Sequence, residues 1–233
     1  MTALRTAERA ARKGLAAADR WMNRVYGARW NPLYASGAIV VGLLVVLLAT
    51  GLYLLLFYRI GAPYASVERI TGQVWLGRWI RTLHRYASDV AVVAVAVHAF
   101  RMFAQGRSWG PRALAWVSGL VLLFVLFVSG WTGYVMVWDG QAHLLAVEGA
   151  RFLDVLPLFS EPIRRLFVGA EPLPAAFFFL NLFLHIALPI GVGLILWLHV
   201  SRVARPTLLP PPGLRWGLLA LLVWVKLGLP ILF

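Results

Sequence analysis

Long apolar segments alternate with short polar ones along this chain. Each apolar segment is long enough to cross a hydrocarbon core of about 30 Å as an α-helix. The segments are 33–58, 79–103, 113–138, 175–203 and 214–233. The connection 59–77 is polar and contains helix-breaking Gly61, Pro63 and Gly72. The pattern therefore predicts an all-α membrane protein with several transmembrane helices.

The chain divides into three parts by this pattern. Residues 1–31 are basic and amphipathic without an apolar core, which predicts a helix on the membrane surface. Residues 32–205 hold four spans, which we expect to form a four-helix bundle. Residues 206–233 combine a Pro-rich link with a fifth transmembrane helix. In the long connection 139–174, two short amphipathic pieces predict helices lying at the interface.

Composition and charge support this interpretation. Of 233 residues, 61% are hydrophobic, and the net charge is +13. The basic residues gather at the ends of spans, which indicates membrane topology and argues against nucleic acid as a partner. The segment 1–31 has seven Lys or Arg against two acids, whereas 139–174 has five acids against three Arg. The positive-inside rule then predicts a multi-pass protein of a bacterial-type cytoplasmic membrane, with its N-terminus in the cytoplasm. Cysteine is absent, which excludes thiolate-bound clusters and covalent haem on this chain.

Two pairs of histidines carry the candidate chemistry. His84 and His98 lie 14 positions apart in the second span, and His185 and His199 lie 14 apart in the fourth. Fourteen residues return a helix to within about 40° and advance about 21 Å, so each helix presents two histidines on one face. Imidazole is an axial ligand of haem iron, and facing helices are a usual way to hold a cofactor. We therefore predict two stacked bis-histidine b-type haems, an outer one on His84/His185 and an inner one on His98/His199. Four unrelated intramembrane histidines are the alternative.

Glycines repeat the same period on the other two spans. Gly37 and Gly51 are 14 apart in the first span, and Gly119 and Gly133 are 14 apart in the third. Glycine lets backbone approach a flat group closely. With the predicted topology, Gly51 and Gly133 are level with the outer histidines, and Gly37 and Gly119 with the inner ones. We interpret them as haem-packing positions; ordinary small-residue packing between membrane helices is the alternative.

Cations and donors near the histidines are candidate partners of haem propionates. Snorkelling arginines and interfacial tryptophans are the alternative interpretation. The candidates are Arg81, Arg85, Arg101 and Trp116.

Taken together, these motifs resemble the N-terminal, dihaem part of the cytochrome b of bc-type and plastid-type quinol-oxidising complexes. The resemblance covers roughly residues 30–205. It rests on the spaced glycines with Thr50, TyrAlaSerVal at 64–67, Arg81-x-x-His84-Arg85, His98-x-x-Arg101, Trp116-x-x-Gly119, Gly133-Tyr134-Val135 to Trp138, and His185-x-x-x-Pro189 with His199. It implies a four-helix bundle with a low-potential haem near the outer face and a higher-potential haem near the inner face.

The chain also departs from the family. The family's loop after the third span usually reads Gly-Tyr-Val-Leu-Pro-Trp-Gly-Gln, whereas residues 133–141 read GYVMVWDGQ, without the proline and with one extra residue. The Pro-Glu-Trp-Tyr motif that the family's outer quinol site needs does not occur in this sequence. Either a partner subunit completes that site, or the protein does not run a bifurcating quinol cycle.

Further polar residues are candidates for quinone exchange or for pairing within the membrane. By resemblance, an inner quinone site would lie beside Ser201 and Arg202. An outer site would lie near Tyr134, Trp138 and His143, although a solvated loop histidine is the simpler interpretation of His143. Intramembrane charges are costly, and Asp89 and Lys226 lie at depths where they could form an ion pair. Contact of Lys226 with a partner subunit and snorkelling of its side chain are the alternatives.

Three functions remain open from the sequence. The first is a dihaem subunit that moves electrons across the membrane between quinone and redox partners, and that is not a complete enzyme alone. Such partners would be a Rieske protein, a c-type cytochrome or an iron–sulfur or molybdenum subunit, with a homodimer as a further arrangement. The second is a haem-bearing membrane anchor of an extracytoplasmic dehydrogenase or multihaem cytochrome. The third is a scaffold or transporter without haem.

Overall fold

The structure, a computed structural model, describes residues 2–155, 161–167, 173–201, 208–217 and 220. Within these residues it is helical and contains no strand. Four helices are long and apolar enough to cross a membrane. They are α2 (Ser36–Phe57), α4 (Gly77–Ala104), α5 (Ala113–Val135) and α7 (Ala175–Ser201). The prediction of an all-α membrane protein with a four-helix transmembrane bundle is confirmed.

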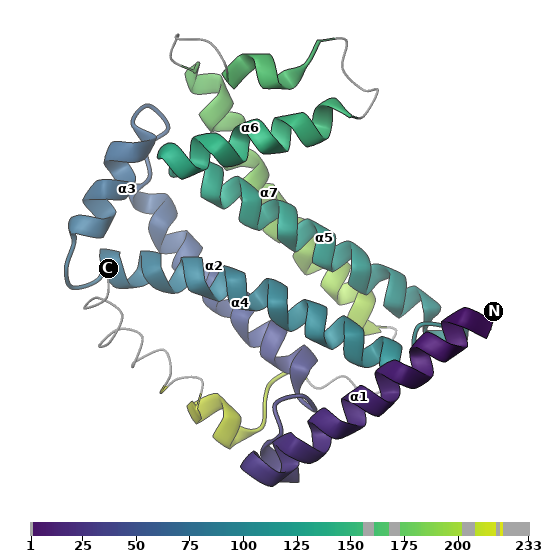
Figure 1. The fold of residues 1–233 in the computed structure, drawn as a ribbon. Coiled ribbons are helices and arrows are strands. Elements are labelled where there is room, and N and C mark those ends of the chain that lie inside the picture. Colours follow the sequence, from purple (N-terminus) through teal and green to yellow (C-terminus); the bar gives the residue numbers. More distant parts are fainter. Residues whose placement is uncertain (1, 156–160, 168–172, 202–207, 218–219, 221–233) are drawn as a thin grey trace.

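The four spans associate as two pairs. Helix α2 packs along α4, and α5 packs along α7, while α4 and α5 join the pairs (Figure 1). A small apolar core of Val40, Ala91, Val95 and Leu126 holds α2, α4 and α5 together in the middle of the bundle. Many other apolar side chains of the spans face outward, as expected of helices that lie in lipid.

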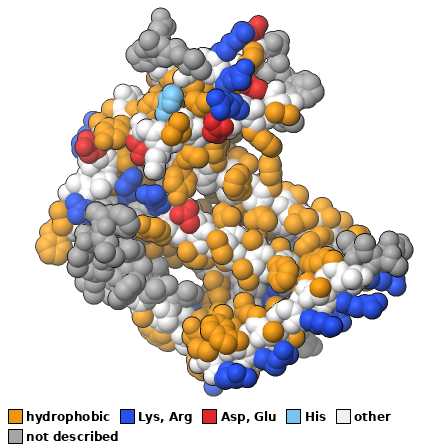
Figure 2. All heavy atoms as spheres, in the orientation of Figure 1, with side chains coloured by type: hydrophobic (Ala, Val, Ile, Leu, Met, Phe, Trp, Pro, Cys, Tyr) orange, Lys and Arg blue, Asp and Glu red, His pale blue; other side chains and the backbone are white. Residues whose placement is uncertain are grey.

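Helix α1 (Thr2–Tyr26) crosses one end of the bundle and contacts α4 (Figure 1). The short 3₁₀-helix η1 (Ala28–Trp30) then leads into α2. Figure 2 shows Lys and Arg side chains along the outer edge of α1 and apolar side chains across the middle of the molecule. A helix with a basic outer edge is thus present where the sequence predicts an amphipathic one, and its place on a membrane surface stays a prediction. We call this end of the bundle the α1 end.

The opposite end, the α6 end, carries three shorter elements. Helix α6 (Gly140–Asp154) and the 3₁₀-helix η3 (Ile163–Phe167) occupy the long connection, close to the two interfacial pieces that the sequence predicts. Helix α3 (Pro63–Gly72) lies in the polar connection, where the sequence predicts Pro63 and Gly72 to be helix breakers; for these two residues that prediction was wrong. Pro63 occupies the first turn, where no backbone N–H is needed, and Gly72 is the last residue. Both residues bound the helix and do not interrupt it.

The third span ends three residues earlier than predicted. Trp138 has a φ of 55°, in the left-handed region that side chains other than glycine rarely adopt. Asp139 then caps α6, because its carboxylate accepts a hydrogen bond from the backbone N–H of Ala142 at 2.8 Å. The chain therefore turns sharply at Trp138 and does not continue the α-helix.

Tyr58 links two spans at the α6 end, just beyond the last residue of α2. Its hydroxyl donates a hydrogen bond to the backbone carbonyl of Met136 at 3.0 Å, at the end of α5. Burial raises the pKa of Tyr58 to about 12, so the phenol is neutral and remains a donor.

The predicted fifth span, 214–233, lies largely outside the described residues. Residues 212–217 are helical. Lys226 is among the residues that the structure does not describe.

Candidate haem-binding site

The first histidine pair lies at the α6 end, between α4 and α7. The ring centroids of His84 and His185 are 6.2 Å apart, with the ring planes inclined at 69°. Metal–imidazole nitrogen bonds of about 2 Å on either side of one atom would separate two ring centroids by roughly 6 Å. The two imidazoles are therefore spaced as a pair of axial ligands to one iron would be.

The second pair lies about four helical turns away, toward the α1 end. His98 is on α4 and His199 on α7, and the two side chains lie within electrostatic range of each other. Because α4 and α7 run in the same direction, the equal 14-residue spacing places both second histidines about 21 Å further along the bundle. The fold thus brings the four predicted histidines together as two pairs.

Each of the four predicted glycines lies against one histidine ring. A Cβ atom on Gly133 would meet Cε1 of His185 at 2.8 Å, and one on Gly37 would meet that of His98 at 3.0 Å. At Gly51 the neighbour is His84, at 3.2 Å, and at Gly119 it is His199, at 3.3 Å. The levels are those expected from the sequence, but the group seated on each glycine here is an imidazole. A side chain at these positions would press on the candidate ligand.

A hydroxyl residue precedes every one of these glycines, and its side chain reaches the same histidine. The four Oγ–Nδ1 distances are 2.8–3.2 Å. The pairs are Ser36–His98, Thr50–His84, Ser118–His199 and Thr132–His185. The sequence interpretation noted Thr50 alone. The signal it missed is the dipeptide Ser/Thr-Gly at 36, 50, 118 and 132.

These contacts repeat with a twofold pattern. The pair α2/α4 presents serine at the α1 end and threonine at the α6 end, and the pair α5/α7 presents the same. Each pair of helices is thus a unit of two Ser/Thr-Gly dipeptides opposite two histidines. Two such units face each other across the bundle.

The predicted propionate partners fall into two groups. At the α6 end, the guanidinium of Arg85 lies 5.5 Å from the ring centre of Tyr134, and Arg81 lies within electrostatic range of Asp139. Neither Arg81 nor Arg85 forms an ion pair by distance within the described residues.

At the α1 end, Arg101 already has a partner. Its guanidinium forms an ion pair with Asp19 of α1 at 2.8 Å and lies 4.9 Å from the ring centre of Tyr34. The Arg101 side chain is only 8% exposed, so this contact fixes α1 on the end of α4. The sequence interpretation missed Asp19. Trp116 packs against Phe103, with ring centroids 6.2 Å apart.

Asp89 also has a partner that the sequence did not indicate. The hydroxyl of Tyr134 donates to its carboxylate, with oxygen–oxygen distances of 2.9 and 3.0 Å. Tyr134 adjoins Gly133, so the contact joins α4 to α5 near the first histidine pair. A Tyr hydroxyl satisfies a carboxylate without neutralising its charge. An additional ion pair with Lys226 stays a prediction.

Trp138 and His143, predicted for an outer quinone site, lie together at the α6 end. Their ring centroids are 5.7 Å apart, and Phe178 packs edge-on against Trp138 at 5.2 Å. The Nε2 atom of His143 lies 3.2 Å from the carbonyl of Phe167, an acceptor, and therefore carries a proton if the contact is a hydrogen bond. The result is an aromatic cluster with one imidazole. Tyr134 lies one helical turn before Trp138, with its hydroxyl turned to Asp89.

At the α1 end, the predicted quinone residues are only partly described. Ser201 is the last residue of α7, and its hydroxyl donates to the carbonyl of Leu198 at 2.8 Å. Arg202 lies outside the described residues.

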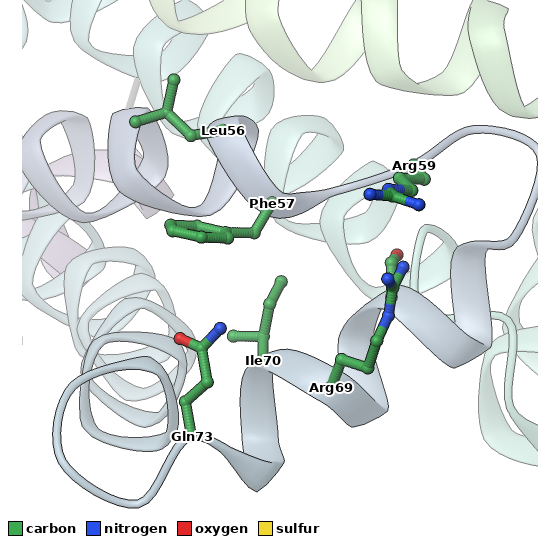
Figure 3. A pocket seen from close by; sticks show the side chains of 7 residues that line it. Leu56, Phe57, Arg59, Arg69, Ile70 and Gln73 are labelled. Atoms are coloured by element: carbon green, nitrogen blue, oxygen red, sulfur yellow. The ribbon is translucent and has the colours of Figure 1, made fainter.

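Two surface cavities contain none of the predicted site residues. One, of about 120 Å³, lies between the end of α2 and α3, and Figure 3 shows Arg59 and Arg69 turned toward each other to one side of Ile70. The other, of about 420 Å³, lies between α1 and the end of α4 and is lined by Arg12, Asp19 and Arg107, among others. Burial lowers the pKa of Arg107, and the nearby charges of Arg112 and Arg101 lower it further.

Comparison with known families agrees with the histidine geometry. The family model described as cytochrome b/b6/petB matches residues 22–205. The chain therefore belongs to the cytochrome b family. Membership in this family implies b-type haem, and the four apolar helices make the chain an integral membrane protein.

Individual relatives are moderately similar. The menaquinol:cytochrome c reductase cytochrome b subunit of Geobacillus thermodenitrificans is 27% identical over 178 residues, which are 73% of this chain and 79% of that subunit. Cytochrome b6 of Synechococcus elongatus is 26% identical over 181 residues, 75% of this chain and 83% of the relative. The Bacillus subtilis menaquinol:cytochrome c reductase cytochrome b subunit is 28% identical over 139 residues, and the match spans 59% of this chain and 62% of that protein.

A solved structure shares the fold. A chain of a hyperthermophilic respiratory Complex III matches with a TM-score of 0.66 at 17% identity, covering 84% of this chain and 60% of that one. This supports the four-span bundle.

The residues present fit a haem at each level. Haem supplies four nitrogen ligands to its iron and needs two axial donors, and each level offers two imidazoles from facing helices. The spacing of His84 and His185 is that of two ligands on one metal. The glycines leave room for the imidazole rings against the backbone of the neighbouring helix. All four glycines have their histidine on the neighbouring helix of the same pair.

Proposed function

We propose that this chain is a dihaem cytochrome b subunit. It moves electrons across the membrane between a quinone/quinol site and redox partner subunits of a respiratory or photosynthetic complex. The observation that carries the proposal is the pair of facing histidines at each of two levels, each histidine seated on a glycine and bonded to a hydroxyl. The relatives support it, since those named above are cytochrome b subunits of a menaquinol:cytochrome c reductase or cytochrome b6.

The chain's own residues hold two cofactors at fixed separation. His84 and His185 bind the haem at the α6 end, and His98 and His199 bind the haem at the α1 end. Each haem, when bound, accepts and releases one electron at its iron. The helices fix the two levels about 21 Å apart along their axes, and the apolar core between the levels keeps water out.

Side chains near each surface would neutralise the haem propionates. Arg81 and Arg85 serve this role at the α6 end, where neither has an ion-pair partner among the described residues. At the α1 end, Trp116 can donate its indole N–H. Arg101 can serve only by sharing its five N–H donors between a propionate and Asp19.

A quinone exchanges electrons and protons beside one of these levels. The α6 end offers the aromatic cluster of Trp138 and His143, next to Tyr134, and an aromatic wall with one polar group suits a quinone ring. The α1 end offers Ser201 and, beyond the described residues, Arg202. The charge distribution supports a cytoplasmic α1 end, because α1 and the loop after α4 are rich in Lys and Arg.

The direct test is spectroscopic. The full chain, expressed in membranes and purified in detergent, should show a reduced-minus-oxidised spectrum with a b-type α-band and two haems per chain. A redox titration should resolve two one-electron components. His98→Leu should remove the haem at the α1 end and leave the other. A wild-type spectrum without an α-band would refute the proposal, and loss of only the α6-end haem in His98→Leu would refute the assignment of levels.

The subunits that copurify decide between two forms of this function. A Rieske protein or c-type cytochrome would identify a quinol-oxidising complex. A molybdenum, iron–sulfur or multihaem partner would identify the haem-bearing anchor of an extracytoplasmic enzyme. The loop 133–141, which reads GYVMVWDGQ without the family's proline, is the observation that favours the anchor.

A further inference from the structure

We infer that Ser118, Thr50 and Thr132 are positioning residues that hold their histidines with the proton on Nδ1 and the lone pair of Nε2 free for iron. Ser36 makes the same contact with His98, but there the geometry does not determine which atom donates the hydrogen. The inference rests on the proposed haem binding. It concerns how the protein prepares and tunes the ligands, which neither the family match nor the relatives assign.

The argument begins with where each hydroxyl hydrogen goes. A hydroxyl has one hydrogen to donate and two lone pairs to accept with. Thr50 donates to the carbonyl of Val46 in its own helix, with an oxygen–oxygen distance of 2.6 Å. Thr132 donates to Ser129 at 2.8 Å, and Ser118 donates to Ala115 at 3.1 Å. Such bonds to a preceding carbonyl are usual for Ser and Thr within helices. The hydrogen of each hydroxyl is therefore already used.

The contact with the imidazole must then run in the opposite direction. Since the hydroxyl of Thr50 has no second hydrogen, the 2.8 Å contact requires Nδ1–H of His84 to donate to Oγ1. The same holds for Ser118 with His199 at 3.0 Å. A neutral imidazole has one N–H, so a hydrogen on Nδ1 leaves Nε2 with its lone pair free.

His185 supplies an independent check. Its Nδ1 lies 3.2 Å from the hydroxyl of Thr132 and 2.9 Å from the backbone carbonyl of Ser129. A carbonyl only accepts hydrogen bonds, so Nδ1 must carry the hydrogen whatever the hydroxyl does. Both neighbours therefore agree on the same tautomer.

Ser36 differs from the other three. Among the described residues, its hydroxyl contacts only Nδ1 of His98, at 3.1 Å, and no carbonyl of its own helix. Its hydrogen is therefore free to point either way, and His98 is less strongly held in one tautomer. In three of the four contacts the geometry thus determines the direction of the hydrogen bond. In the fourth, at Ser36, either group can donate.

This arrangement has two consequences for a bound haem. First, the ligand is oriented before haem arrives, and loss of such a partner of a metal-bound histidine commonly weakens binding by about 10-fold or more. Second, a hydrogen bond from Nδ1–H makes the imidazole a stronger electron donor, which favours the ferric state. Removing the acceptor should therefore raise the midpoint potential of the haem at that level only.

The test uses variants that remove a hydroxyl and keep the size of the side chain. Thr50→Val should raise the potential of the α6-end haem and leave the α1-end haem unchanged. Thr132→Val should raise it less, because Nδ1 of His185 keeps the carbonyl of Ser129 as an acceptor. Ser118→Ala should do the reverse, and Ser36→Ala should change the α1-end haem less than Ser118→Ala does. We expect a three- to tenfold change in the ratio of reduced to oxidised haem at a fixed potential. This corresponds to about 30–60 mV for one electron.

A matched control lies on the ligand helix itself. Ser88 of α4 donates to the carbonyl of Arg85 at 2.7 Å and makes no hydrogen bond to a histidine within the described part of the chain. Ser88→Ala should leave both potentials unchanged. If Ser88→Ala shifts a potential as much as Thr50→Val does, or if Thr50→Val shifts neither, the inference is wrong.

A second measurement does not require haem. Imidazole ¹⁵N spectra of the haem-free protein, labelled at histidine, should show His84, His185 and His199 with hydrogen on Nδ1, and Thr50→Val should weaken this state at His84 alone. Spectra with hydrogen on Nε2 in the wild-type protein would overturn the inference. These results are distinct from failure of the proposed function, which would appear as a wild-type chain that binds no haem.

Discussion

Replacing Gly133 with alanine tests the packing of a candidate ligand against the neighbouring helix. The added Cβ would lie 2.8 Å from Cε1 of His185, whereas ordinary van der Waals contact begins at 3.4 Å. The ring must therefore retreat by about 0.6 Å, while metal–ligand distances typically hold to within about 0.2 Å. In the haem-free protein the imidazole can shift by lengthening its hydrogen bonds to Thr132 and Ser129, at a cost that the gain in helix propensity offsets. Once iron fixes the ring, the same movement strains a bond.

We therefore expect Gly133→Ala to weaken haem binding without weakening the fold. Overpacking of this kind costs about 1–3 kcal/mol, which corresponds to a roughly 5- to 150-fold loss of affinity for the α6-end haem. The helix itself gains, since alanine is favoured over glycine by about 1 kcal/mol in a helix interior. At Gly119, where the Cβ would lie 3.3 Å from His199, the required movement is about 0.1 Å and the haem should be retained.

The assay is haem content per chain, with redox titration to identify which haem is lost. Gly130→Ala is the matched control, because it lies one turn earlier on α5 and a Cβ there would meet nothing within 4 Å. Thermal unfolding of the haem-free proteins checks that the fold is intact. The packing argument would be refuted if Gly133→Ala bound both haems as tightly as Gly130→Ala does.

Three further predictions concern contacts away from the haem levels. Asp19→Asn leaves the buried Arg101 without its carboxylate partner. Amide hydrogen exchange in α1 should therefore become faster by a factor that corresponds to about 2–3 kcal/mol. Unchanged protection of α1 would count against the contact. Asp89→Asn and Tyr134→Phe should each destabilise the protein by about 1–2 kcal/mol, and the double variant should lose clearly less than their sum; strict additivity in thermal unfolding would mean that the two side chains do not interact. Because burial raises the pKa of Tyr58 to about 12, the phenol stays neutral in the folded protein while the unfolded chain ionises from about pH 10. Stability should therefore be unaffected below pH 10 and fall as pH rises from 10 to 12. Tyr58→Phe should reduce this alkaline fall between unfolding measurements at pH 9 and pH 11, and an identical fall in the variant would exclude Tyr58 as a source.

The sequence alone determined the levels of the site. Helical period fixes which residues share a face and how far apart they lie, so a 14-residue spacing of histidines and glycines could be converted to two depths without coordinates. Apolar length and the placement of arginines likewise predicted the four spans and the surface helix. These are local properties, because each depends only on residues within one helix.

Only the tertiary structure decided which side chains meet across helices. Helix packing brings Thr50 to His84, Asp19 to Arg101 and Tyr134 to Asp89 across 34, 82 and 45 positions of sequence. No period within a single helix encodes such distances, since they depend on how two helices are rotated and offset against each other. The same reason explains why the sequence did not predict the contacts of the histidines with glycines and hydroxyls of neighbouring helices. The sequence placed glycines and histidines at equal depths, and the packing of α2 on α4 and of α5 on α7 gave each histidine its own glycine and its own hydroxyl.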